Sequence, residues 1–215
     1  IKIIKMISFL IRDNNWNNYQ PKIIKSKIQK NNKEIQIIFD IEFSDKNQKM
    51  ITQNKYIFNN NSIKLISVGK FLTNFVTNRA GFNILLPLKN ICGQKINIIS
   101  TDSKNTTSTF PQIISPDQPF INIKELSHTI LDIDINYKFK GIKFEMEDQR
   151  NWGDASYKVY SGSLLDPFPI KINKDKKFYQ EILISFTKNS NNNVIIKQID
   201  NKNIIKIKNK TDIIG

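Results

Sequence analysis

Apolar and polar residues alternate along most of this chain, and a period of two restricts the fold to β-structure. The clearest run is Glu34–Phe43, which reads EIQIIFDIEF. Alternation puts successive side chains on opposite faces of a strand, whereas a helical face would repeat about every 3.6 residues. Shorter runs of the same kind are Tyr56–Phe58, Ile63–Val68, Ile96–Ile99, Ile130–Phe139, Ile182–Phe186 and Val194–Ile199.

These runs are short, rich in β-branched residues and separated by clusters of Asn, Lys, Asp, Ser or Gly. Such spacing is typical of all-β architectures. We expect an antiparallel β-sandwich, of which a supersandwich is one form, with at most one or two short helical turns. Residues 1–190 would form the sandwich domain. Residues 191–215 contain no aromatic residue, and we expect them to be an edge strand or a linker toward a downstream domain.

Three segments depart from simple alternation. Ser67–Asn78 is compatible with one helical turn or with a strand that carries a bulge at Gly69. Ile121–Ile130 contains Asn122 as a possible N-cap and Glu125 three positions later, which is capping-box spacing and favours a short helical turn. Two prolines make Ser115–Pro119 a turn or rigid loop.

The formal charge of +14 raises the question of a nucleic acid or an anionic membrane as partner. The lysines are spread along the chain, and the excess of Ile, Asn and Lys over Gly, Ala, Arg and Pro is typical of an A/T-rich genome. We therefore expect neither partner. No apolar run approaches the ~18 residues of a membrane span. A single Cys, Cys92, excludes an intramolecular disulfide, and a cytoplasmic location is expected.

Only three arginines occur, and each falls in a distinctive cluster. In a composition that drifts toward Lys, an Arg indicates a task that needs its planar, bidentate guanidinium. Arg12 and Arg150 share their clusters with the two tryptophans, while Arg79 lies in the segment NRAGF. The alternative is that the arginines form structural ion pairs, Arg12 with Asp13 and Arg150 with Asp148 or Asp154.

The segment Phe144–Tyr160, FEMEDQRNWGDASYKVY, is the densest polar run in the chain. Alternation puts Glu145 and Glu147 on one face of a strand, with Cα atoms about 6.5–7 Å apart. Two carboxylates so close can divide acid and base roles, bind a hard cation, or accept hydrogen bonds from sugar hydroxyls. The alternative is an exposed strand face with a few salt bridges.

From this segment and the arginine cluster around Arg79 we predict two sets of site residues and neither a metal nor another cofactor. The catalytic candidates are Glu145, Glu147, Asp148 and Arg150. The substrate-binding candidates are Trp152, Asp154, Tyr157, Lys158 and Arg79, with Trp152 or Tyr157 as a stacking surface. His128 is the only histidine, which excludes a zinc site built from several histidines.

Four segments, in this order and approximate spacing, resemble the D-apionate lactonase family. They are Ile7–Pro21, Phe75–Pro87 (FVTNRAGFNILLP), Phe110–Phe120 (FPQIISPDQPF) and Gly141–Pro169. The resemblance spans roughly Ile4 to Phe186. Two positions depart from it, because Leu86 stands where we expect His and Gly153 where we expect Thr.

The resemblance implies an enzyme that hydrolyses a sugar-acid lactone, D-apionolactone, to its open acid. It also implies a longer protein in which a β-rich N-terminal region precedes a TIM barrel. Within this chain Glu145 or Glu147 would be the base, and Arg150 or Lys158 would stabilise the oxyanion or a carboxylate. The alternative function is a non-catalytic module for carbohydrate recognition or interdomain contact.

Overall fold

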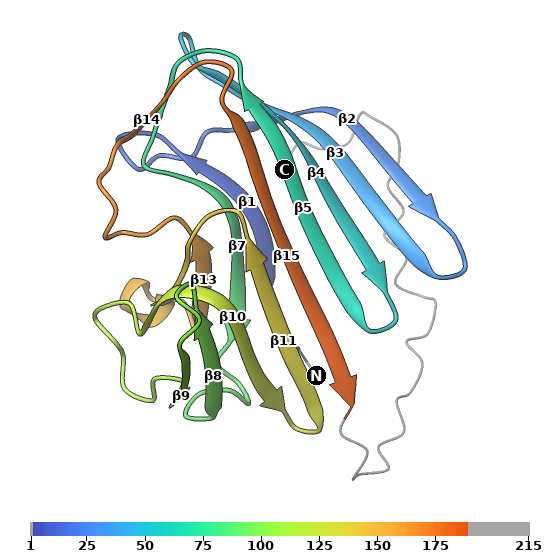
Figure 1. The fold of residues 1–215 in the computed structure, drawn as a ribbon, viewed down its shortest axis with the longest axis vertical. Helices are drawn as coiled ribbons and strands as arrows, with labels where there is room; N and C mark the ends of the chain where they lie inside the picture. Colours follow the sequence, from blue (N-terminus) through green and yellow to red (C-terminus); the bar gives the residue numbers. More distant parts are fainter. Residues whose placement is uncertain (1, 189–215) are drawn as a thin grey trace.

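The structure is a computed structural model that describes residues 2–188, and almost all of its regular structure is β-strand (Figure 1). One short 3-10 helix, η1 (Gln149–Trp152), interrupts the strands. The strands are β1 (Met6–Arg12), β2 (Pro21–Lys30), β3 (Glu34–Ser44), β4 (Lys49–Asn59), β5 (Ser62–Phe71), β6 (Phe75–Thr77), β7 (Arg79–Pro87), β8 (Lys95–Ser100), β9 (Asn105–Thr109), β10 (Phe120–Ile130), β11 (Ile133–Lys140), β12 (Phe144–Asp148), β13 (Ser156–Ser161), β14 (Ile170–Ile172) and β15 (Lys177–Lys188).

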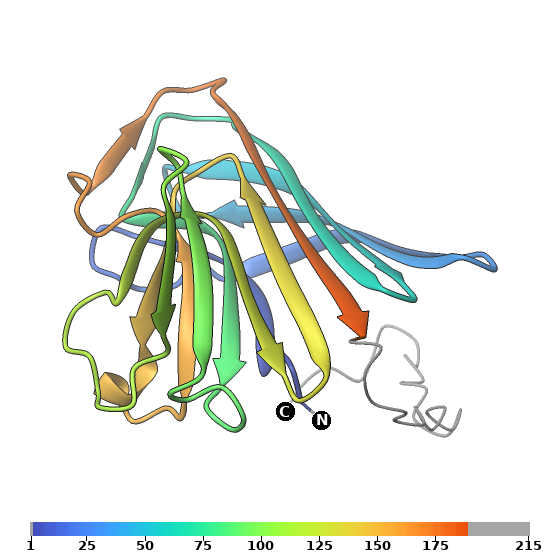
Figure 2. The same ribbon diagram turned by 60° about the horizontal axis from the view of Figure 1, so that its bottom comes forward.

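Thirteen of these strands form one antiparallel sheet in the order β1-β7-β13-β12-β10-β11-β15-β5-β4-β3-β2, with β8 and β9 branching from β10. Strands β14 and β6 form a small second sheet. The large sheet curves strongly, so that its first and last strands approach each other (Figure 2). The predicted all-β, antiparallel, sandwich-like fold with a single helical turn is therefore confirmed.

Aromatic side chains join the two halves of the curved sheet. The Phe9 ring of β1 lies 5.8 Å from the Phe43 ring of β3, although the two strands are far apart in the sheet order. The Tyr56 ring of β4 likewise lies 6.2 Å from the Phe82 ring of β7. Both pairs belong to or pack against one continuous hydrophobic core. Burial of these apolar faces drives the sheet to close on itself.

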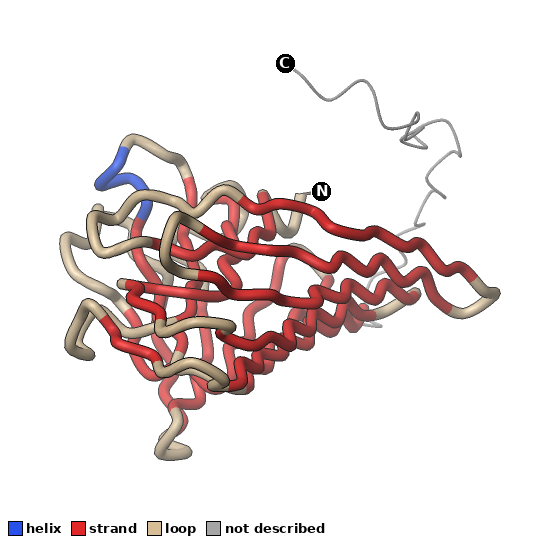
Figure 3. Tube along the Cα trace, turned by 90° about the horizontal axis from the view of Figure 1, so that it is seen from above, coloured by secondary structure: helices blue, strands red, loops and turns tan. Residues whose placement is uncertain are grey.

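Six of the seven alternating runs lie in strands as predicted, with Ile130 at the end of β10 and the rest of its run leading into β11. The longest run, Glu34–Phe43, coincides with β3. Val194–Ile199 and the predicted edge strand or linker lie outside the described residues. Figure 3 shows the hairpin of β2 and β3 extending from the body as an arm, and every residue of β2 is exposed.

Two local predictions were wrong. Strand β5 runs through Gly69 without a bulge, because a glycine there lets the Ile51 carbonyl of β4 approach closely; a Cβ would lie 2.6 Å from that oxygen. Ile121–Ile130 is part of β10 and holds no helical turn. Asn122 has φ 54° and lies where the pairing register shifts. The extra residue of this bulge shifts the alternation of apolar and polar residues by one position, and the resulting spacing resembles that of a helix.

Candidate functional site

The hairpin of β12 and β13 places the two glutamates as alternation predicts. Phe144 and Met146 are buried in the core, whereas Glu145 and Glu147 point to the opposite face. Across the strand pair, Glu145 is opposite Tyr160 and Glu147 is opposite Lys158. We call this core-distal side of β1, β7, β13 and β12 the polar face; its members are Ser8, Arg12, Arg79, Asn83, Glu145, Glu147, Lys158 and Tyr160.

Glu147 is held by two donors on the polar face. Trp152 donates its indole Nε1–H to one carboxylate oxygen at 2.8 Å, and Lys158 forms an ion pair with the other. Burial opposes ionisation of Glu147, but the hydrogen bond and charge of Lys158 outweigh it and hold the pKa of Glu147 below its ordinary value. Burial lowers the pKa of Lys158 despite this pairing.

Glu145 lies deeper and is fully buried. The Tyr160 hydroxyl donates to its Oε2 at 2.9 Å, and the Leu164 backbone N–H donates to the same atom at 3.2 Å. Its Oε1 has no hydrogen-bond partner in the described part of the chain. The loop after β13 therefore covers one carboxylate of the pair and leaves the other nearer the surface.

Arg79 lies between two aromatic rings at the other end of the polar face. Its guanidinium carbon is 4.0 Å from the centre of the Tyr160 ring and 5.5 Å from that of Trp16. The Trp16 ring contacts Phe168 edge-on at 5.4 Å, so two loops meet over the arginine. Burial lowers the pKa of Arg79, although Glu147 and Glu145 act in the opposite direction.

Asp148, Arg150 and Tyr157 lie together on the core side of the same hairpin. Asp148 is fully buried and forms a two-point ion pair with Arg150, with N···O distances of 2.9 and 2.6 Å. Arg150 also donates to the carbonyls of Pro111 and Gln112, each at 2.8 Å. Tyr157 donates its hydroxyl to Pro111. This triad attaches the loop after β9 to the β12–β13 hairpin.

The remaining two predicted residues lie at the margin. Trp152 is 75% exposed, which leaves most of its indole open to solvent. Asp154 pairs with Lys5 and accepts a hydrogen bond from Ser156. Of the nine predicted site residues, the structure brings Glu145, Glu147, Lys158 and Arg79 together on the polar face, with Trp152 touching Glu147. The catalytic and binding roles remain predictions.

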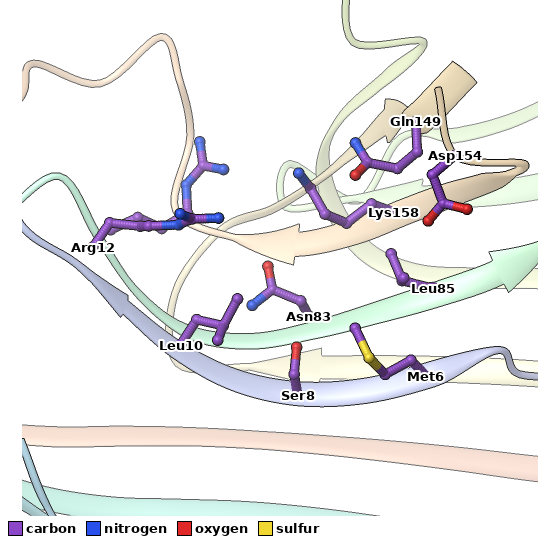
Figure 4. A pocket seen from close by; sticks show the side chains of 10 residues that line it. Met6, Ser8, Leu10, Arg12, Asn83, Leu85, Gln149, Asp154 and Lys158 are labelled. Carbon is purple, nitrogen blue, oxygen red and sulfur yellow. The ribbon is translucent and has the colours of Figure 1, made fainter. Parts of the chain in front are cut away.

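A pocket of about 280 Å³ opens on the polar face between β1, β7 and β13 (Figure 4). Arg79, Asp154 and Lys158 line it, as does Arg12, which the sequence indicated only as a distinctive arginine. The other lining residues are Met6, Ser8, Leu10, Asn83, Leu85 and Gln149. Alternation along Met6–Arg12 could have placed Ser8 and Arg12 on one face. Gln149 lies in the polar segment Phe144–Tyr160 and Asn83 in the segment Phe75–Pro87, but neither was predicted as a site residue.

His128 takes no part in this arrangement. It is 5% exposed, lies edge-on to Phe110 at 5.3 Å and stacks on Tyr137 at 5.8 Å. Burial lowers its pKa to about 4. Among residues 2–188, no group of three or more His, Cys, Asp or Glu side chains is placed to hold a metal ion. Within the same range, no helix is long and apolar enough to cross a membrane.

The fold is a curved antiparallel β-sandwich that recurs in solved structures of very different sequence. The GH36 α-galactosidase AgaA of Geobacillus stearothermophilus matches with a TM-score of 0.53 at 10% identity, over 84% of this chain and 30% of that one. The Slr1438 protein of Synechocystis matches with a TM-score of 0.51 at 10% identity, over 85% of this chain and 78% of that one. These matches concern the fold alone.

Sequence comparison identifies the family within that fold. The family model described as "D-apionate lactonase, N-terminal domain" matches residues 1–189, so the chain belongs to this family. A D-apionate lactonase of Brucella anthropi is 28% identical over 190 residues, which cover 87% of this chain and 31% of the relative. The chain thus spans about a third of that relative's length. The predicted resemblance is confirmed.

Proposed function

We propose that this chain is the N-terminal part of a sugar-acid lactone hydrolase and that its polar face forms part of the substrate site. The observation that carries the proposal is the pairing of Glu147 with Lys158 beside Glu145 and Arg79, on the face that the core does not use. Carboxylates and cations rarely gather on a partly buried surface unless they are paired or functional. Membership of the D-apionate lactonase N-terminal family supports D-apionolactone as substrate.

Lactone opening needs a base for water and a donor for the carbonyl oxygen. In our proposal Glu147 takes a proton from water as the water oxygen attacks the carbonyl carbon. Lys158 stabilises the oxyanion, the ring C–O bond breaks, and the leaving oxygen takes up the proton. Glu145 is the second base candidate. Asp148 and Arg150 would position the hairpin. They form an ion pair with each other, and Arg150 also donates to the backbone carbonyls of residues 111–113.

A second function, a non-catalytic recognition or interdomain module, is favoured by one observation. The chain covers 31% of its lactonase relative, so the longer protein would hold a downstream domain, a TIM barrel by the family resemblance, that could carry the chemistry. The polar face would then contact a sugar or that domain. In both functions the small-molecule partner of the longer protein would be a sugar-acid lactone.

The two functions separate in one assay. D-Apionolactone hydrolysis would be followed in a pH-stat for the 215-residue chain and for the longer protein that contains it. If the longer protein is active and Glu147→Gln abolishes that activity, the result supports a hydrolase whose substrate site includes the polar face. Full activity in the longer protein that is unchanged by Glu145→Gln and Glu147→Gln supports the module. Absence of lactonase activity from the longer protein contradicts both the substrate and the reaction.

A further inference from the structure

Arg12 and Arg79 are direct register partners on β1 and β7, and both line the 280 Å³ pocket. Like charges directly opposite each other on neighbouring strands destabilise a sheet. Neither arginine forms an ion pair with a carboxylate anywhere in residues 2–188. Among the described residues, the side chain of Arg12 donates one hydrogen bond, to the Trp16 carbonyl at 2.8 Å. The two guanidinium groups therefore lie opposite each other with no carboxylate in ion-pair contact among these residues, and Arg79 is packed between the rings of Tyr160 and Trp16.

Hydrogen-bond donors in the same pocket also lack acceptors. Over the described residues, Nε and Nη2 of Arg79, Nε2 of Gln149 and Oγ of Ser8 are buried without a hydrogen-bond partner. A buried donor with no acceptor is destabilising, so such groups are rare unless a ligand or water completes them. The three residues belong to β7, η1 and β1, and all of them line the pocket. A ligand rich in hydrogen-bond acceptors would give each of these atoms a partner.

Charge and shape limit the ligand further. Three cations, Arg12, Arg79 and Lys158, line the pocket together with one carboxylate, Asp154. Lys158 is paired with Glu147 and Asp154 with Lys5, so the excess positive charge of the pocket comes from the two arginines. The pocket volume of about 280 Å³ lies just below the range of typical ligand pockets, which starts at about 300 Å³, so only a small ligand fits. Leu10, Leu85 and Met6 add apolar surface for C–H groups. A small anion that carries several hydroxyls satisfies each of these features.

We propose that this pocket binds the ring-opened, anionic sugar acid, with its carboxylate between Arg12 and Arg79. Gln149, Ser8 and Lys158 would contact the hydroxyls. The inference rests on the proposed function for the identity of the sugar acid, and it assigns the pocket to the product form, since the lactone is neutral. Release of the acid would then be opposed by the two arginines, and the acid should inhibit turnover.

Calorimetric titration of the 215-residue chain tests the proposal. Gluconate serves as an available sugar acid, sorbitol as the matched polyol without a carboxylate, acetate as the carboxylate without hydroxyls, and inorganic phosphate as a bare anion. We expect gluconate to bind at least about tenfold more tightly than each of the other three, and to weaken as salt rises. Equal binding of sorbitol, acetate or phosphate would overturn the assignment.

Substitutions locate the site. Arg79→Gln should weaken gluconate binding about tenfold or more, as should Arg12→Gln, whose half-exposed side chain makes a folding defect less of a concern. Lys138→Gln is the matched control. It removes one positive charge from β11, where Lys138 pairs with Glu125 away from the pocket, and it should leave gluconate binding unchanged. The proposal would be overturned if Arg12→Gln left the gluconate affinity unchanged. It would also be overturned if Lys138→Gln reduced that affinity as much as the arginine substitutions do.

The outcome is independent of catalysis. If the longer protein hydrolyses no lactone but the chain binds gluconate through the two arginines, the proposed function fails and the sugar-acid pocket stands. If lactonase activity is found while gluconate and D-apionate do not bind, the pocket assignment fails and the proposed function stands.

Discussion

Glu147 on β12 and Lys158 on β13 are cross-strand partners, and their side chains form an ion pair on the sheet face that the core leaves free. The pair keeps a carboxylate ionised in a half-buried position, because the positive charge offsets the cost of burial. Glu147 is therefore ionised at neutral pH, which is the state in which a carboxylate can accept a proton from water.

Glu147→Gln should lower lactonase kcat/KM of the longer protein by about 10²–10⁴-fold if Glu147 is the base. The lowered pKa of Glu147 predicts that the acid limb of the wild-type pH profile lies below the ordinary Glu value of about 4.3. Initial rates measured between pH 3 and 8 check both points. Glu125→Gln, which breaks an ion pair on β10, is the control and should retain activity. An unaffected Glu147→Gln variant would remove Glu147 from the mechanism.

Arg150→Ala should destabilise the fold by roughly 3–5 kcal/mol, because it leaves the buried Asp148 carboxylate without its partner and releases the carbonyls of Pro111 and Gln112. Lys143→Ala removes a half-exposed pair with Asp166 and should cost at most about 1 kcal/mol. Urea denaturation monitored by circular dichroism compares the two. Similar small losses would show that Arg150 does not hold the loop.

The same pair sets a pH dependence in strong acid. The pKa of Asp148 is held below its ordinary value, since the hydrogen bonds from Arg150 outweigh burial. Its contribution to stability is therefore present above the unfolded value of about 3.9 and is lost as pH falls through the lower folded value.

His128 should make the domain acid-sensitive in a higher window. Its pKa falls from 6.5 to about 4 on burial, so the unfolded chain binds the proton first. Stability is full above pH 6.5 and declines toward pH 4 by roughly 3 kcal/mol, at about 1.4 kcal/mol per pKa unit. Thermal melts from pH 4 to 7.5 measure the slope. His128→Phe, which keeps a ring beside Phe110 and Tyr137, should flatten this window; an unchanged slope would assign it to other groups.

Trp152→Ala should weaken sugar-acid or lactone binding with little loss of stability, because the indole is mostly exposed. A stacked sugar ring would lose a contact of about 1 kcal/mol, equivalent to a fivefold change in affinity. Trp152→Phe keeps a stacking surface but loses the hydrogen bond to Glu147. If both variants bind and react as the wild type does, Trp152 has no part in the site.

Local pattern determined much of this protein. Alternation identified β3 and five other strands, which are β4, β5, β8, β11 and β15. It also placed Glu145 and Glu147 on one face, because side-chain direction along a strand depends only on residue parity. The family could also be read from contiguous segments. The errors at Gly69 and Asn122 have one cause: close strand approach and a bulge depend on the neighbouring strand, which a single segment does not specify.

The tertiary structure decided which of the distinctive residues meet. Arg150 was interpreted as a catalytic candidate beside Glu147, yet its donors point to carbonyls of the loop after β9, on the other side of the hairpin. Arg12 and Arg79 are 67 positions apart in the chain and oppose each other only because β1 pairs with β7. Strand partners and registers are set by burying all apolar faces of the curved sheet at once. A local period of two therefore determines which residues share a face, and only the closed sheet determines which charges share a pocket.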